Sequence, residues 1–473
     1  MILAKQKSKT DLLEDPLFRK ILLFTLPLIA TNLLQTFYNA ADMIIVGLSH
    51  EPDAVGAIGT TSSFINLVVN VFMGFSLGSN VVVARHIGAR DRDGASRAVH
   101  TAVCMSLLFG LLGTGIGFPL SRPILRAMGN TGPLLDLSVT YTHIYFLGVP
   151  FLSLTNYLIS IFRAKGDTKT PLTVLSCAGL LNVGLNLFFV RACGLSVEGV
   201  ALATLIANVA SALVLWLLLA RDEGFCRLSV RRLRIHPHSF FEILHIGIPA
   251  GIQGALFSVS NMLIQSSILQ VNNSLCAPDS AYQPVVKGNA AAGNLEGFVY
   301  TATHAVSQAS VTFTSQHMGA QKYKRIHRVQ LCCYALSGAI AVLVGISLFL
   351  LRTPLLALYG VTNGAVGSLE HLAMQTAVLK MKTLFIPYFL LAFMEVGSGV
   401  LRGLGRSITS TLISLFGACL FRIVWLFTVF RAYETLDSIY LSYPISWALT
   451  ALVCFVCEIV VLRSMIKTHR ADA

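Results

Sequence analysis

Residues 27–47 read PLIATNLLQTFYNAADMIIVG, a mostly apolar run with a single carboxylate, Asp42, inside it. An apolar helix of about 20 residues spans a lipid bilayer, and an acid near its centre costs about 2.5 to 3.5 kcal/mol on insertion scales. This cost predicts that Asp42 is kept for a function. The competing interpretation places Asp42 near the outer interface, because the polar segment 49–53 follows seven residues later, roughly 10 Å of helix rise.

The composition predicts a polytopic membrane protein. Hydrophobic residues make up 55% of the 473 and charged residues 12%, whereas soluble domains carry about 25% charged residues. We therefore expect an all-α membrane protein with twelve transmembrane helices. The apolar segments lie near 19–48, 55–84, 98–120, 136–162, 169–191, 197–220, 240–271, 287–316, 328–351, 372–401, 406–431 and 439–466.

The net charge of +13 is distributed unevenly along the chain. Of the 35 Lys and Arg, 26 lie in the amino-terminal arm, the carboxy-terminal tail and the loops after the even-numbered segments, 8 lie in the other loops, and Arg422 lies inside a span. By the positive-inside rule, both termini are cytoplasmic. The amino-terminal arm has no signal-peptide pattern, and the scattered basic residues form no nucleic-acid-binding motif.

Two similar halves flank a basic linker. FRKILLFTLPLIATNLLQTFYN at 18–39 compares with FFEILHIGIPAGIQGALFSVSN at 240–261, ARHIGAR at 84–90 with SQHMGAQ at 315–321, and FRAKGD at 162–167 with LRGLGR at 401–406. Six spans in each half give parallel repeats, and substrate sites in such folds lie between the halves near the midplane. We therefore predict a cytosolic arm, an N-lobe, a linker, a C-lobe and a cytosolic tail, with limits at 1–17, 18–220, 221–239, 240–466 and 467–473.

The two sixfold halves, the 27–47 segment, the Gly88-Ala89-Arg90 loop and the RAKGD sequence that closes the fourth span resemble the multidrug and toxic compound extrusion (MATE) family. The resemblance covers essentially the whole chain. It implies two six-helix lobes that form a V-shaped central cavity. It also implies a secondary antiporter in which an inward sodium or proton gradient drives export of cationic, amphipathic compounds.

The family's amino-terminal cation site combines an acid in span 1 with polar residues in spans 5 and 6. Asp42 matches the acid, Asn182 and Asn186 lie on one helical face of span 5, and Thr204 is the matching hydroxyl. Many members have an aspartate where this chain has Asn186. One carboxylate with amide and hydroxyl oxygens suits a hard cation such as Na⁺, while helix-to-helix hydrogen bonding is the structural alternative for the two asparagines.

A single buried aspartate also suits proton coupling, because a low dielectric favours its protonated form. We expect protonation or cation capture at Asp42 to bend span 1 at Pro27, closing the pocket and releasing the drug outward. The alternative is a passive kink, which membrane helices tolerate.

The second half has its own span charges, Glu296, Glu395 and Arg422. At about 1.5 Å per residue, Arg422 and Glu296 lie roughly 24 and 30 Å from the cytoplasmic ends of their spans, and Glu395 only about 10 Å. Depth therefore predicts a Glu296–Arg422 pair. It leaves Glu395 free to meet a cationic substrate or a second proton, or to reach toward the cytoplasmic interface. His143 and His304 are predicted to be satisfied polar groups, and the Cys454-x-x-Cys457 pair to be packing residues.

Two other function classes remain open. A flippase of lipid-linked saccharides would share the superfamily fold but need cations facing the cavity to hold phosphate. Three span acids against Arg422 favour a cationic substrate instead. A membrane enzyme would need a nucleophile with its base, or a metal cluster, and the sequence shows neither pattern. The sequence also has no phosphate-binding loop, so we do not expect ATP to supply the energy. We expect no cofactor, no nucleic-acid partner, and a monomer in a bacterial inner membrane.

Overall fold

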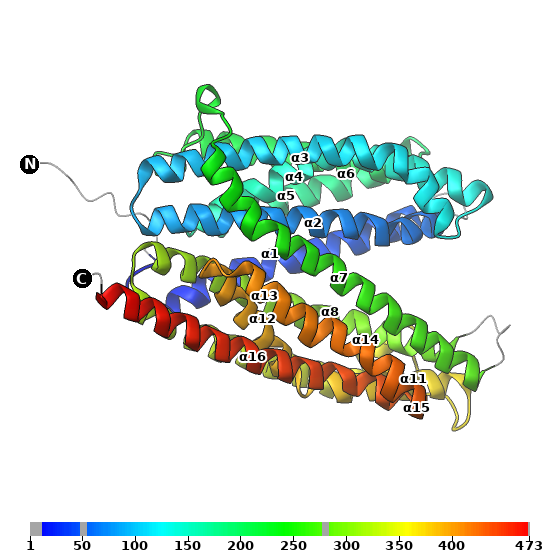
Figure 1. The fold of residues 1–473 in the computed structure, drawn as a ribbon. Helices are drawn as coiled ribbons and strands as arrows, with labels where there is room; N and C mark the ends of the chain where they lie inside the picture. The colour runs from blue at the N-terminus through cyan, green and yellow to red at the C-terminus, as the bar shows by residue number, and fades with distance from the viewer. Residues whose placement is uncertain (1–11, 48–53, 277–282, 472–473) are drawn as a thin grey trace, which may run out of the picture. The chain divides into compact units, whose positions relative to one another are not determined.

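The computed structural model describes residues 12–47, 54–276 and 283–471, and every regular element in these ranges is helical (Figure 1). Predominantly apolar runs form these helices because each helix satisfies its own backbone hydrogen bonds. The elements of the first half are α1 (Leu17–Val46), α2 (Ala54–Gly88), α3 (Arg92–Ala127), α4 (Gly132–Ala164), α5 (Lys169–Leu187) with the π-helical turn η1 (Phe188–Ala192), α6 (Val197–Ala220) and the 3-10 turn η2 (Val230–Arg232).

The elements of the second half are α7 (Pro237–Leu275), α8 (Pro284–Gly319), α9 (Tyr323–Leu350), α10 (Arg352–Leu358), α11 (Leu369–Phe385), α12 (Tyr388–Gly403), α13 (Ser407–Ser414), η3 (Leu415–Leu420), α14 (Phe421–Trp425), η4 (Leu426–Phe430), α15 (Arg431–Tyr433) and α16 (Leu436–Ala471). The elements from α13 to α15, including the π-helical turns η3 and η4, form one helical run over residues 407–433. The short helix α10 lies outside the twelve predicted segments.

Helices occupy all twelve apolar segments. In the part of the chain that the structure describes, ten helices are long and apolar enough to cross a membrane, and the pair α11 and α12, bent by 50° at a short break, makes an eleventh. The break contains Pro387, which cannot supply a backbone N–H to a helix. The remaining segment is α8, whose 36 residues are long enough but include polar side chains such as Asn289, Glu296 and His304.

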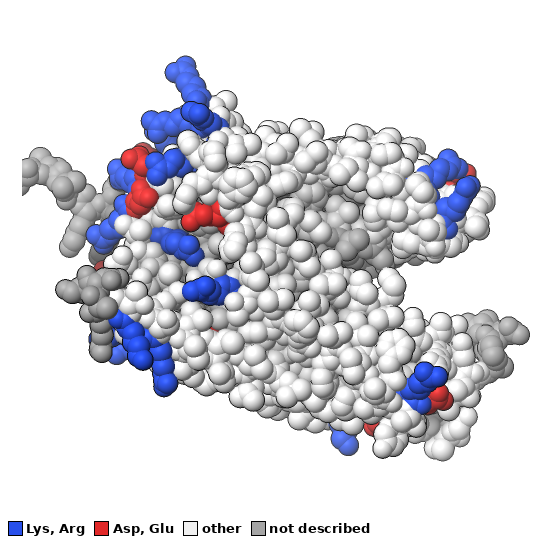
Figure 2. Space-filling view, viewed as in Figure 1, with Lys and Arg blue, Asp and Glu red and all other residues white. Residues whose placement is uncertain are grey.

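The helices present apolar side chains outward, as expected for a chain solvated by lipid. Large exposed residues include Leu111, Leu180, Leu343 and Phe427. On the face drawn in Figure 2, Lys and Arg lie mainly toward the helix ends, and the surface between is largely uncharged. Such a surface would be unfavourable in water over so large an area.

The chain forms two compact units. Unit 1 comprises residues 1–16, 23–254 and 315–321, and unit 2 comprises 17–22, 255–314 and 322–473. The first part of α7 therefore packs with unit 1. The cause is a close backbone approach, because a Cβ atom on Gly74 of α2 would lie 2.3 Å from the backbone nitrogen of Gly251 of α7. The lobe limits proposed from the sequence stay a prediction.

Helix α4 is central to unit 1, where it packs against α2, α3 and α6. Small residues permit the approach to α3, since a Cβ on Gly110 would lie 2.5 Å from the Cα of Pro150. In unit 2, α12 packs against α9 and α16. A buried aromatic group supports this packing, with the Tyr388 and Trp447 rings 5.4 Å apart.

The backbone agrees with the internal similarity seen in the sequence. Arg90 and Gln321, at matching positions of the second landmark, both have positive φ values, 57° and 53°. Gly166 and Gly405, at matching positions of the third, have φ values of 89° and 79°. Each of these glycines donates its backbone N–H to the carbonyl three residues before it, Gly166 to Arg163 O at 2.9 Å and Gly405 to Arg402 O at 2.8 Å. The two halves therefore end corresponding helices in the same way.

Candidate functional site

The structure brings the four predicted amino-terminal site residues together in unit 1. Asp42 of α1, Asn182 and Asn186 of α5 and Thr204 of α6 form one hydrogen-bonded chain. Asn186 Nδ2 donates to Asp42 Oδ1 at 2.5 Å and to Asn182 Oδ1 at 3.2 Å. Asn182 Nδ2 donates to Thr204 Oγ1 at 3.2 Å. We call this group the Asp42 chain.

The surroundings of the Asp42 chain are apolar. Asn186 is fully buried and Asn182 nearly so, beside a cluster that includes Ile45, Val46 and Val200. One turn earlier in α1, the Tyr38 hydroxyl donates to the Ser176 carbonyl at 3.1 Å and ties α1 to α5. These contacts fix the acid against the two amides.

One oxygen of the Asp42 chain is unpaired among the residues that the structure describes. The Asn186 carbonyl oxygen, Oδ1, is buried and accepts no hydrogen bond from any of them. Buried polar atoms are nearly always paired, so an unpaired one needs an explanation. Together with the Asp42 carboxylate, it provides oxygen atoms that suit a hard cation, or an acceptor for the proton of a neutral Asp42.

Pro27 lies inside α1, which continues through it from Leu17 to Val46. The Thr31 hydroxyl donates to the Pro27 carbonyl at 2.8 Å, and a hydroxyl that bonds back along the helix in this way often bends it. The structure places Pro27 fifteen residues before Asp42 on the same helix. Ion binding at Asp42 and bending at Pro27 would therefore affect the same helix, α1.

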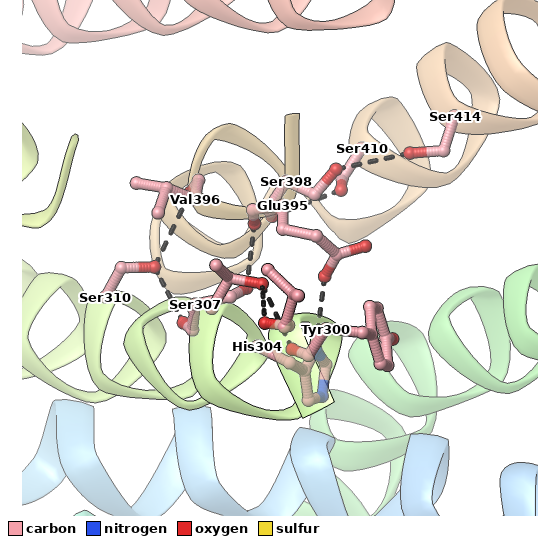
Figure 3. Close-up of polar contacts among 11 residues, drawn as sticks. Tyr300, His304, Ser307, Ser310, Glu395, Val396, Ser398, Ser410 and Ser414 are labelled. Atoms are coloured by element: carbon pink, nitrogen blue, oxygen red, sulfur yellow. Dashed lines mark hydrogen bonds and ion pairs between the residues drawn. The ribbon is translucent and has the colours of Figure 1, made fainter. Parts of the chain in front are cut away.

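Glu395, which depth arguments left free, has a partner in unit 2. His304 Nδ1 lies 3.2 Å from Glu395 Oε2, and the Tyr300 ring stacks on the His304 ring at 5.3 Å (Figure 3). The Ser307 hydroxyl donates to the Glu395 carbonyl oxygen at 2.7 Å. The glutamate is only 8% exposed, and His304 is a satisfied polar group as predicted.

Serines join the helices around this acid (Figure 3). The hydroxyl of Ser310 in α8 donates to the Val396 carbonyl of α12 at 3.5 Å, and the hydroxyls of Ser398 in α12 and Ser414 in α13 lie 3.2 Å apart. Close approach is possible because α12 carries glycine at this face: a Cβ on Gly399 would lie 2.3 Å from Ser310 Oγ. The acid therefore sits in a tightly packed helix junction.

The predicted pair between Glu296 and Arg422 is not formed. Glu296 Oε2 instead lies 3.4 Å from Lys380 Nζ. Arg422 donates from Nε to Ser446 Oγ at 2.9 Å and stacks over the Tyr443 ring at 4.3 Å. Depth along the membrane does not determine which faces of two helices meet. The partner of Glu296 is Lys380, which lies within the predicted segment 372–401.

Lys380 belongs to a wider polar network in unit 2. Its Nζ donates to the Asn289 carbonyl at 3.4 Å, the Asn289 amide donates to Gln265 Oε1 at 3.1 Å, and Tyr440 donates to Asn289 Oδ1 at 3.2 Å. Four helices, α7, α8, α11 and α16, thus converge on this network. The signal in the sequence was a lysine inside an apolar segment.

Sequence analysis also missed Glu458 in α16. This glutamate is fully buried. It accepts a hydrogen bond from the Gln330 amide and one from the Tyr334 hydroxyl at 3.1 Å. The adjoining Cys454 and Cys457 are free thiols, in agreement with their interpretation as packing residues.

Comparison with known proteins gives one consistent result. The family model described as MatE matches residues 27–188 and 251–428. The chain is 25% identical over 467 residues to the "Probable multidrug resistance protein YoeA" of Bacillus subtilis (strain 168), covering 96% of this chain and 95% of the relative.

Solved structures share the fold. A structure titled "Crystal structure of MATE in the bent conformation" matches with a TM-score of 0.85 and 21% identity, covering 95% of this chain and 96% of that one. A second, titled "Crystal structure of MATE in the straight conformation", matches with a TM-score of 0.84 at 21% identity, covering 95% and 97%. With its apolar helices and a family match over both halves, this chain is a multi-pass membrane protein that belongs to the MatE family, the multidrug and toxic compound extrusion (MATE) transporters.

Proposed function

We propose that this protein is a secondary active antiporter that exports cationic amphipathic compounds in exchange for H⁺ or Na⁺. The observation that carries the proposal is the Asp42 chain, in which the acid accepts a hydrogen bond from Asn186, and Asn186 is linked through Asn182 to Thr204 across three helices. Membership of the MATE family and the similarity to a relative named as a probable multidrug resistance protein support it.

Asp42 and Asn186 supply the coupling chemistry in this proposal. When Asp42 is ionised, it accepts the hydrogen bond from the Asn186 NH₂ group. When Asp42 takes up a proton, its hydroxyl can donate to the unpaired Asn186 Oδ1. A sodium ion would instead take oxygens from Asp42 and Asn186, with Asn182 and Thr204 reorienting behind them. Either ion neutralises a charge that is costly inside the membrane.

Pro27 is the proposed hinge of this mechanism. It lacks the N–H that would complete the helix at this point, so α1 can bend there at little cost. Pro27→Ala should leave the protein folded and slow its transport; transport at the wild-type rate would favour a passive kink.

Glu395 of unit 2 is proposed to meet the substrate or a second proton. The Glu395 carboxylate lies beside the His304 ring, and a cationic compound could take the place of His304 as its partner. Glu296 is paired with Lys380 and Arg422 is enclosed by aromatic rings. We assign the latter two groups a supporting role in shaping the substrate site.

The proposed setting is a bacterial inner membrane, with a monomeric chain and both termini in the cytoplasm. The excess of Lys and Arg in the tail, the arm and the loops after even-numbered spans supports this orientation. No cofactor is proposed, because ion gradients would supply the energy.

Export of ethidium from proteoliposomes tests the proposal. Wild type and Asp42→Asn would be compared under a sodium gradient alone and a proton gradient alone, with equal amounts of folded protein. We expect one gradient to drive export by wild type and none to drive it in the variant. Export by the variant at the wild-type rate would remove Asp42 from the coupling site.

A flippase of lipid-linked saccharides remains the second candidate, and one observation favours it. Lys380 and Lys382 lie within α11, so the cations inside spans include these two lysines in addition to Arg422. Glu458 adds an acid, and the excess of acids over cations is therefore smaller than predicted. If neither gradient drives ethidium export by wild type, translocation of a fluorescent lipid-linked saccharide should be assayed next.

A further inference from the structure

A cavity of 450 Å³ lies in unit 1 between the start of α3 and the segment 229–236 that leads into α7. Its charged lining consists of four arginines, Arg97, Arg231, Arg232 and Arg234, and one acid, Asp93. With histidines neutral, four positive charges and one negative leave +3. The cavity is lined by the first turns of α3 and by the linker, and by no residue of α1, α5 or α6, which carry the Asp42 chain.

The segment 229–236 is fastened to α3 at both ends. The Ser229 backbone N–H donates to His100 Nε2 at 3.1 Å, and the His236 backbone N–H donates to the hydroxyl of the next residue of α3, Thr101, at 3.0 Å. His100 Nδ1 in turn donates to the Ser96 carbonyl at 2.7 Å. Both ring nitrogens of His100 are thus used, so the segment is held in one shape.

This fastening projects arginines into the cavity from two sides. The 3-10 turn η2 carries Arg231 and Arg232, Arg234 follows, and Arg97 extends from α3. The four side chains belong to exposed residues, and within the described ranges none of them lies in an ion pair with a carboxylate. Burial, followed by the positive charges of Arg234 and Arg97, lowers the pKa of His236. Positive charge therefore gathers here in excess of the one lining acid, Asp93.

We propose that this cavity binds a phosphate-bearing anion, either the headgroup of an anionic lipid or a soluble phosphorylated compound. A guanidinium group is planar and can donate two parallel hydrogen bonds to two oxygens of the same phosphate. Several guanidinium groups around one cavity favour a ligand with more than one negative charge over a ligand with a single carboxylate. The volume falls in the range of ligand sites, about 300–1,000 Å³. Leu233 is the lone apolar lining residue, so the lining does not suit an amphipathic drug.

Two probes separate the sources of phosphate. Purified full-length protein in neutral detergent would be dialysed against labelled pyrophosphate, and protein in nanodiscs of mixed phosphatidylcholine and phosphatidylglycerol would be analysed for retained phosphatidylglycerol. The variants are R231Q/R234Q, Arg97→Gln on the opposite wall, and Arg227→Gln as the control. Arg227 is an exposed arginine of the same linker that does not line the cavity.

We expect wild type to bind at least one probe, and R231Q/R234Q and Arg97→Gln to bind it about tenfold or more weakly, because charge-assisted hydrogen bonds are lost. Arg227→Gln should bind as wild type does. Binding of pyrophosphate identifies a soluble ligand, and retention of phosphatidylglycerol alone identifies a lipid. Absence of binding to both probes would overturn the proposal, as would an equal loss in Arg227→Gln, which would indicate diffuse charge. Unchanged melting temperatures establish that the variants are folded, and neither assay depends on transport.

Discussion

In unit 1 the acid of α1 is held by neutral side chains, whereas in unit 2 Glu296 and Glu395 each lie beside a basic side chain. Asp42 accepts from Asn186, Glu395 lies beside His304 and Glu296 beside Lys380. The helix ends of the two halves nevertheless match closely, at Gly166 and Gly405. A duplicated backbone has therefore kept its turns and changed its buried charges.

This difference separates two kinds of buried acid. An acid among amides has no countercharge, so binding a proton or cation relieves a large electrostatic cost. An acid that already has a basic partner gains less from another cation. We therefore expect ion coupling to depend more on Asp42 than on Glu296 or Glu395, and stability to depend more on the charge pairs of Glu296 and Glu395.

The largest expected effect contrasts Asp42→Asn with Glu395→Gln. The first should abolish gradient-driven export, because the variant cannot exchange a charge. The second should reduce export without abolishing it, since it removes a paired acid. Initial rates of ethidium export in proteoliposomes measure both. Equal loss in the two variants would erase the distinction between the units.

Removal of Lys380 should give the largest loss of stability. Lys380→Met leaves Glu296 without its countercharge, and breaking such a buried pair costs about 3–5 kcal/mol, reduced here because Glu296 is partly exposed. A thermal unfolding scan in detergent would detect a lower melting temperature.

Two matched variants sharpen the Lys380 test. Adding Glu296→Leu to Lys380→Met should recover most of the loss, because both charges are then absent. The neighbouring Lys382 is exposed, so Lys382→Met should melt close to wild type. A double variant no more stable than Lys380→Met would show that the pair is not the cause.

A smaller effect tests the duplicated turns. Gly166→Ala and Gly405→Ala should each cost about 1–2 kcal/mol, because a Cβ is unfavourable in the left-handed region. The losses should be similar in size, since the φ values match. Gly184 lies inside α5 with open space around it, so Gly184→Ala should be neutral or stabilising. The melting temperatures of the three variants and wild type test this prediction. A lower melting temperature in only one of the two turn variants would argue against equivalent backbones.

The smallest effect is a dependence on pH at the start of α3. The Gly94 backbone N–H donates to Asp91 Oδ1 at 2.9 Å. This bond, and the bond with His86, outweigh burial and lower the pKa of Asp91. A lowered carboxyl pKa stabilises the folded state above the unfolded value, about 3.9. The contribution is therefore lost as the pH falls below that value toward the folded pKa.

Because Asp91 is more than a third exposed, solvent screening keeps its contribution below about 1 kcal/mol. Unfolding of wild type and Asp91→Ala should be compared between about pH 3 and 6. The two proteins should converge at the acidic end. A constant difference in melting temperature across the range would contradict this explanation.

Much of the polar chemistry of unit 1 was predictable because it follows local spacing. Asn182 and Asn186 share a helical face by their i, i+4 spacing, and the structure joins them by a hydrogen bond. The partners in unit 2 were not predictable in the same way. Glu296 and Lys380 are far apart in the sequence, and depth along the membrane left their rotation about the helix axes undetermined. Lys380 and Glu458 also lie within segments so apolar that their charges did not alter the assignment of a span.

The sequence by itself determined the twelve helical segments and the internal duplication, because apolar length and repeated landmarks are properties of the chain alone. It also indicated the acid of the first helix. Only the tertiary structure decided which side chains meet: the amides that hold Asp42, the cation beside Glu296, and the segment 229–236 fastened to α3. Side-chain contacts depend on how helices are rotated and how closely they approach, and small residues spread along several helices set both together.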